Sequence, residues 1–124
     1  VILADASSWI EYLHGRFPEL GEASAREQVI MHPWVLGEVS LGPLSNRHQT
    51  LTEMGTISAA PVIADGLIHQ LIEDQSLDGT GIGWVDCQLL ASAKAMEVNL
   101  WTHDKALKRA WEKVRRSPFD FVAS

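Results

Sequence analysis

The chain has one cysteine, Cys87, among its 124 residues, and it has no long hydrophobic run. A single thiol excludes an intrachain disulfide, and without a CxxC pair the common zinc spacings are excluded as well. No stretch approaches the roughly 20 apolar residues that a membrane-spanning helix requires, and no secretory leader is recognisable. We therefore expect a protein of the reducing cytoplasm that makes no use of a membrane, with Cys87 packed in its core.

The sequence also lacks the signatures of two kinds of nucleotide- or nucleic-acid-binding protein. The glycine-rich segment 77–83 (LDGTGIG) does not contain the GxxxxGK[ST] phosphate loop. A net charge of −6 argues against a protein that coats nucleic acid. Residues 101–124 nevertheless hold six Lys or Arg against three Asp or Glu, so this segment carries +3 and the remainder −9. The basic segment either contacts a phosphodiester backbone or is an ordinary solvated helix face.

What is present is an alternation of short apolar runs with helical patterns. A chain of this length with 46% hydrophobic residues predicts one domain over residues 1–124. Apolar runs predict strands at 1–4, 29–31 and 98–101, and 60–63 and 119–122 are further candidates. Residues 17–21 are expected to form a loop. Helical spacing follows the first strand and recurs at 22–28, 33–41, 44–54, 65–72, 84–96 and 105–114. This order predicts an α/β fold with a parallel sheet.

Four carboxylates lie where these predicted elements meet turns: Asp5, Glu38, Asp86 and Asp104. Because ligands of open α/β sheets bind beyond the carboxyl ends of the strands, we expect these side chains to share one site. Carboxylates gathered in one place repel one another, and a hard divalent cation such as Mg²⁺ relieves that repulsion. The pattern therefore favours a metal-dependent enzyme.

Each carboxylate also has a structural explanation. Asp5, Asp86 and Asp104 are placed to cap helices, since Asp favours helix starts. Glu38 is harder to explain in this way, because it stands among the apolar residues of segment 35–41 and risks burial without a partner.

Four motifs carry these residues: LADASSWIEYL with Asp5, HPWVLGEVSLG with Glu38, GIGWVDCQLLASA with Asp86, and LWTHDKALKRA with Asp104. Together they resemble the PIN-domain ribonucleases, and within them the VapC toxins of bacterial toxin–antitoxin pairs. The resemblance spans essentially the whole chain. It departs from the family at Ala6, where threonine is common.

The resemblance implies a three-layer α/β/α fold with a central, mostly parallel sheet of four to five strands. It implies a metal-dependent endoribonuclease that cleaves tRNA or rRNA with Mg²⁺ or Mn²⁺ and is neutralised by a protein antitoxin in a type II system, and it implies a homodimer. By position, the four carboxylates match the catalytic and metal-binding residues, and Ser7 and Thr102 match supporting hydroxyl residues.

RNA contacts are expected at His103, Lys105, Lys108 and Arg109, although His103 is also explained as a plain surface residue. Partner contacts are expected at Trp9, Tyr12 and Leu13, with Trp9, Trp84 and Trp101 packing in or beside the core.

Two other functions compete with the nuclease. A non-catalytic PIN-like protein that binds RNA or a partner would require a damaged acidic set, and this set is intact. A Mg²⁺-binding receiver domain would require a phosphoacceptor Asp after a central strand, and residues 54–64 contain none.

Overall fold

The computed structural model describes residues 1–119 and residue 121 of the chain. Its sheet has three parallel strands in the order β2-β1-β3, with β1 at Ile2–Ala4, β2 at Val29–Ile30 and β3 at Asn99–Trp101. Leu3 of the central strand pairs with Ile30 on one side and Leu100 on the other. Helices cover both faces of this sheet, which explains why β1 is apolar throughout.

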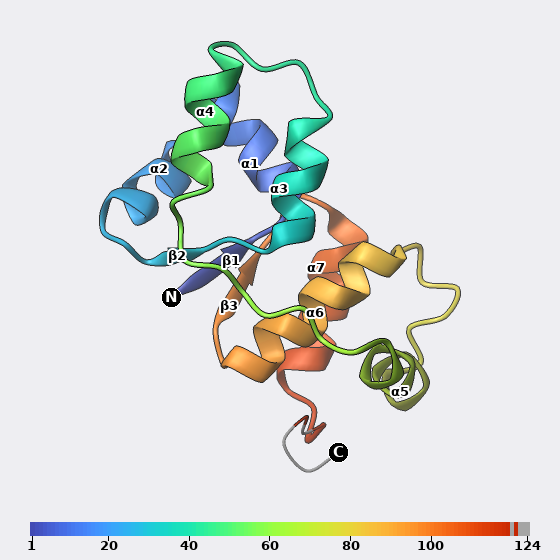
Figure 1. Cartoon of the computed structure of the whole chain (residues 1–124). Helices are drawn as coiled ribbons and strands as arrows, with labels where there is room; N and C mark the ends of the chain where they lie inside the picture. The colour runs from blue at the N-terminus through green and yellow to red at the C-terminus, as the bar shows by residue number, and fades with distance from the viewer. Residues whose placement is uncertain (120, 122–124) are drawn as a thin grey trace.

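Helices α1 to α4 gather on one side of the sheet, and α5 to α7 lie on the other (Figure 1). The α/β fold that the sequence predicts is therefore confirmed. No described helix is long and apolar enough to cross a membrane. The helices are α1 (Ala6–Leu13), α2 (Pro18–Ala25), α3 (Pro33–Ser40), α4 (Arg47–Met54), α5 (Asp65–Gln75), α6 (Trp84–Met96) and α7 (Lys105–Arg115).

The expectation of four to five strands is wrong for the described residues, which form three. Residues 60–63 form no strand, and a single bridge lies just before them, between Met31 and Ala59. Side chains of α6 explain this: Gln88 both accepts from the backbone N–H and donates to the carbonyl of Ile63, and Ser92 donates to the carbonyl of Pro61. These backbone groups are thus engaged by side chains rather than by a neighbouring strand. The candidate at 119–122 includes residues 120 and 122, which lie outside the described residues.

The start of α2 differs from the sequence prediction. The segment 17–21 is not a loop, because α2 begins at Pro18. Proline suits the first helical position, where its missing N–H would have no partner in any case. The same reasoning correctly placed Pro33 at the start of α3.

The core is continuous between the sheet and the helices. Trp9 and Cys87 are buried in it as expected, with 2% and 4% of their surfaces exposed. Trp84 is not a core residue, since 39% of it is exposed at the start of α6. Trp111, which no sequence pattern assigned to the core, is buried and donates its indole N–H to Asn99.

A fully buried histidine begins the helix that carries Glu38. His32 is the N-cap of α3, and its Nδ1 accepts from the backbone N–H of Trp34 at 3.1 Å. The proton of the neutral ring must therefore be on Nε2, which is buried and has no hydrogen-bond partner among the described residues. Burial lowers the pKa of His32, and the neighbouring Gln88 side chain opposes this only in part. Protonation would place a donor against the Trp34 N–H and so remove the cap.

We expect the free energy of unfolding to decrease as the pH falls below about 6.5, the ordinary histidine value. The pKa of His32 is lower in the folded state, so below that pH the unfolded chain takes up a proton that the folded chain refuses. In His32→Asn, which keeps a capping acceptor, this pH dependence should be weaker. Urea unfolding between pH 5.5 and 7.5 measures it, with the exposed His48→Asn as control. An equal pH dependence in both variants would contradict the assignment.

Candidate active site

The site is built around the carboxylate of Asp5, which is 5% exposed at the end of β1. Its Oδ1 accepts from the backbone N–H of Ser8 at 2.9 Å, so that Asp5 is the N-cap of α1, and from the hydroxyl of Ser7 at 2.7 Å. Its Oδ2 accepts from the hydroxyl of Thr102 at 2.5 Å. Three donors thus compensate the burial of this carboxylate.

The segment that leaves β3 is fixed to the same network. Thr102, while donating to Asp5, accepts from the backbone N–H of Asp104 at 3.0 Å. Asp104 is the N-cap of α7, and its Oδ1 accepts from the N–H of Leu107 at 2.9 Å. The backbone N–H of His103 donates to the Ser7 hydroxyl at 2.9 Å. The starts of α1 and α7 are therefore locked together at the carboxyl end of the sheet.

Asp86 and Glu38 reach the site from two other helices. Asp86 lies in the first turn of α6, half-buried, and its Oδ2 accepts from the backbone N–H of Gly83 at 3.0 Å. Glu38 projects from the last turns of α3 and is exposed, so its apolar neighbours in the sequence do not bury it. The apolar residues Val35 and Val39 face the core instead, because they lie four positions apart and so share one face of the helix.

Mutual repulsion shows that the four carboxylates share one region. The pKa of Glu38 is raised, first by partial desolvation and then by the charges of Asp86 and Asp5. The pKa of Asp86 is raised by its burial and by the charges of Asp104 and Asp5, against the opposing hydrogen bond from Gly83. A site that brings together carboxylates of elevated pKa is suited to binding a cation.

The carboxylates are grouped but not tightly closed. Among residues 1–119 and 121, no three His, Cys, Asp or Glu side chains stand close enough together to hold a metal ion directly. The oxygen donors and their mutual repulsion fit a hard divalent cation that keeps part of its water shell, as Mg²⁺ does. Asp5 is already held by three donors, whereas Glu38 has no side-chain hydrogen bond within the described part of the chain. The residues therefore fit a hydrated ion better than a closed cage.

Basic side chains lie next to the site along α7. Lys105, Lys108 and Arg109 occupy the first turns of this helix and are exposed. Lys105 follows directly on Asp104, and Lys108 and Arg109 lie one turn further along the helix. Their contact with RNA stays a prediction.

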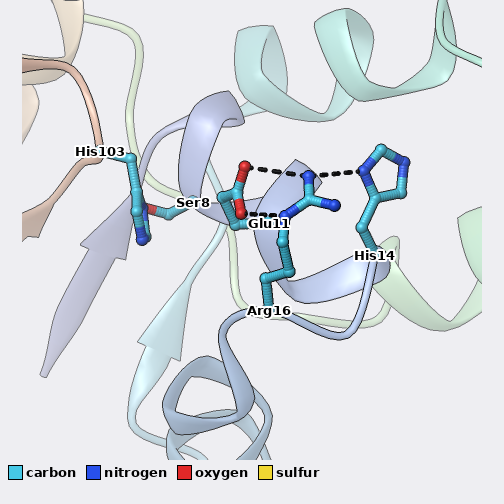
Figure 2. Close-up of polar contacts among 5 residues, drawn as sticks. All are labelled: Ser8, Glu11, His14, Arg16 and His103. Carbon is cyan, nitrogen blue, oxygen red and sulfur yellow. Dashed lines mark hydrogen bonds and ion pairs between the residues drawn. The ribbon is translucent and has the colours of Figure 1, made fainter.

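His103 lies beside Ser8 of α1 (Figure 2). Its Nδ1 is 3.0 Å from the hydroxyl of Ser8, which is fully buried, and its ring meets Phe17 edge-on with centroids 4.6 Å apart. Nothing in the sequence pointed to Ser8 or Phe17 as neighbours of His103, since 95 positions separate Ser8 from His103.

The loop that presents Phe17 is fixed by an ion pair. Arg16 donates to both carboxylate oxygens of Glu11, at 2.5 and 3.1 Å, and its Nη2 is 3.0 Å from Nδ1 of His14 (Figure 2). The pKa of Glu11 is lowered chiefly by the Arg16 hydrogen bond and further by the charges of Arg16, His103 and His14. Glu11 therefore lies between the loop and His103.

The three residues expected to contact a partner line a groove of about 690 Å³ between α1, α2 and α4. Tyr12 and Leu13 are half-buried, whereas Trp9 is almost fully buried and its indole N–H has no hydrogen-bond partner among the described residues. Glu27 and Glu53 also line this groove and are exposed. It thus combines apolar surface with negative charge.

The fold and this acidic edge define a class of α/β protein with carboxylates grouped at the carboxyl end of a parallel sheet. No protein-family model matches the chain. It is 34% identical over 111 residues to the proteins named ribonuclease VapC32 in two Mycobacterium tuberculosis strains, CDC 1551 and H37Rv, covering 89% of this chain and 90% of each relative. The crystal structure of PAE2754 from Pyrobaculum aerophilum shares the fold, with a TM-score of 0.67, 14% identity, and coverage of 98% of this chain and 90% of that one. The chain belongs to the VapC family of PIN-type ribonuclease toxins, which confirms the resemblance seen in the sequence.

Thr102→Val should lower the free energy of unfolding by about 1.5–3 kcal/mol, because it leaves one oxygen of the buried Asp5 carboxylate without its donor. Thr52→Val is the matched control, since Thr52 is exposed on α4 and donates to a helix carbonyl, so its effect should stay within about 0.5 kcal/mol. Urea denaturation of both variants measures the difference. Equal stabilities would show that the Thr102 bond does not hold Asp5.

Proposed function

We propose that this chain is a divalent-metal-dependent endoribonuclease, the toxin of a type II toxin–antitoxin system. The grouping of Asp5, Glu38, Asp86 and Asp104 at one edge of the sheet carries the proposal. The names of the relatives, ribonuclease VapC32, support RNA as the substrate. We also propose, from the family relationship, a cytoplasmic protein that acts as a homodimer on tRNA or rRNA.

In this proposal the four carboxylates would hold hydrated Mg²⁺ or Mn²⁺, and the ion would supply an activated water and charge stabilisation for the departing oxygen. Asp5 contributes a rigid ligand position because Ser7, Ser8 and Thr102 fix both of its oxygens. Glu38 is exposed and unrestrained by comparison, which suits a carboxylate that acts on bound water.

The basic side chains of α7 are proposed to hold the RNA backbone. Lys105, Lys108 and Arg109 are exposed beside Asp104, whereas Lys113, further along the helix, donates to the carbonyl of Gln75. Placing cations beside the acidic centre offsets the repulsion between the protein, with its charge of −6, and a polyanionic substrate.

Purified chain should cleave total cellular RNA at a few sites in Mg²⁺ or Mn²⁺, and EDTA should abolish cleavage. Glu38→Gln and Asp86→Asn should lose at least about 100-fold in rate, since each removes a charge from the acidic centre. Metal-free Glu38→Gln should be as stable as the parent or slightly more so, by less than about 1 kcal/mol, because repulsion between exposed charges is screened.

Glu73→Gln, on the surface of α5, is the matched control and should change neither property. Absence of cleavage by folded protein supplied with either metal, across a broad panel of RNAs, would reject the nuclease. A role in binding RNA or a partner would then be the better explanation.

The groove lined by Trp9, Tyr12 and Leu13 is the proposed antitoxin site. Its glutamates, Glu27 and Glu53, favour an antitoxin segment that combines apolar and cationic side chains. Trp9→Ala is a poor test of this site, because removing a core tryptophan costs about 3–5 kcal/mol of stability whatever binds there.

Charge reversal tests the groove without disturbing the core. Glu53→Lys should weaken binding of the cognate antitoxin about tenfold or more, because it places like charge against a cationic segment. Glu73→Lys introduces the same charge on α5, outside the groove, and should leave affinity within about twofold. Isothermal titration calorimetry measures both. Equal affinities would place the antitoxin elsewhere.

A further inference from the structure

We infer that His103 is a phosphate-binding residue, which donates a hydrogen bond from Nε2 to the RNA backbone next to the scissile bond. The inference rests on the proposed ribonuclease function and adds a contact from the residue that precedes Asp104, whose backbone N–H is held by Ser7, a donor to Asp5.

The ring is held in place although it is exposed. Its backbone N–H donates to Ser7, its Nδ1 meets the hydroxyl of Ser8, and Phe17 contacts it edge-on. An exposed side chain ordinarily keeps its rotamer freedom, and ordering it in advance reduces the entropy that a ligand contact would otherwise lose. An exposed His103 ring that is ordered before binding is suited to contact a ligand.

The contact with Ser8 selects the tautomer of His103. The Ser8 hydroxyl is fully buried, and within the described part of the chain Nδ1 of His103 is the acceptor that its proton reaches. A buried hydroxyl proton left unpaired is unfavourable, so Ser8 donates and Nδ1 accepts. The proton of the neutral ring then resides on Nε2.

An Nε2 that carries a proton donates a hydrogen bond and cannot ligate a metal through that atom. The ring belongs to the residue between Thr102, which donates to Asp5, and Asp104, which caps α7. A phosphodiester that reaches the carboxylates therefore passes within the neighbourhood of this donor. An anionic phosphate oxygen is the acceptor that such a substrate supplies in greatest number.

The ion pair between Glu11 and Arg16 supports the position of the His103 ring indirectly. It joins Arg16, the residue before Phe17, to Glu11 of α1 (Figure 2). Phe17 in turn contacts the His103 ring edge-on and limits its movement. Glu11 and Arg16 act through Phe17 and are positioning residues in this scheme.

The test is binding of a fluorescein-labelled, single-stranded 12-nucleotide RNA of mixed sequence, followed by fluorescence anisotropy. It uses the full chain in an Asp104→Asn background, since asparagine caps a helix as well as aspartate and the substitution prevents turnover. His103→Ala should weaken binding about tenfold, as expected for a lost hydrogen bond to a charged group. His103→Gln, which offers an amide donor in a similar position, should recover most of that loss. Ser8→Ala should weaken binding about threefold.

His69→Ala is the control, because His69 is exposed on α5 and contacts Trp84 rather than the site. Equal binding by His103→Ala and His69→Ala would overturn the inference, and so would a failure of His103→Gln to bind better than His103→Ala. In the chain with Asp104 restored, KM for cleavage of the same RNA should rise about tenfold in His103→Ala while kcat changes less than threefold.

The kinetic arm separates the two proposals. Cleavage with an unchanged KM in His103→Ala rejects the phosphate contact and leaves the nuclease standing. Absence of cleavage in every variant, together with RNA binding that depends on His103, rejects the nuclease and keeps the contact.

Discussion

The hydrogen bonds to the buried carboxylate of Asp5 are the interactions on which the rest of the structure depends. Ser8 donates from the first turn of α1 and Thr102 from the end of β3, 97 positions away from Asp5. A buried carboxylate without such donors costs several kcal/mol, so the two chain segments are stable here only when they meet. The same bonds that stabilise Asp5 therefore set where α1 and α7 begin, and with them the edge of the site.

The remaining carboxylates act in the opposite sense. The pKa values of Glu38 and Asp86 are raised, so at neutral pH their charged forms oppose the folded state instead of supporting it. Repulsion between like charges at this edge destabilises the folded state. Hydrophobic packing of buried residues such as Leu3 and Leu90 stabilises it and offsets that cost. This separation of stable core and repulsive edge is typical of functional sites.

Sequence patterns predicted much of this arrangement, because periodicity and capping are local. The helix at 84–96 was placed with the bounds that α6 has, and β1 and β3 lie within the predicted strands. What the patterns missed depends on contacts between distant segments. The number of strands depends on side chains of α6 that bind the backbone at Pro61 and Ile63, and the exposure of Glu38 and Trp84 depends on which elements lie opposite them. No single-sequence signal pairs Thr102 with Asp5.

Capping and function turn out to be one physical arrangement rather than competing explanations. Asp5 and Asp104 are N-caps, and Asp86 lies in the first turn of its helix, so three helix N-termini converge on the acidic edge. Each contributes backbone N–H groups and the positive end of a helix dipole, which stabilise a nearby carboxylate. Glu38 lies near the end of α3 and has no such compensation. Neither a backbone hydrogen bond nor a basic neighbour opposes the rise in its pKa. The helix N-termini thus stabilise the charged forms of the three aspartates. The charged form of Glu38 lacks this stabilisation, so a bound cation would stabilise it most.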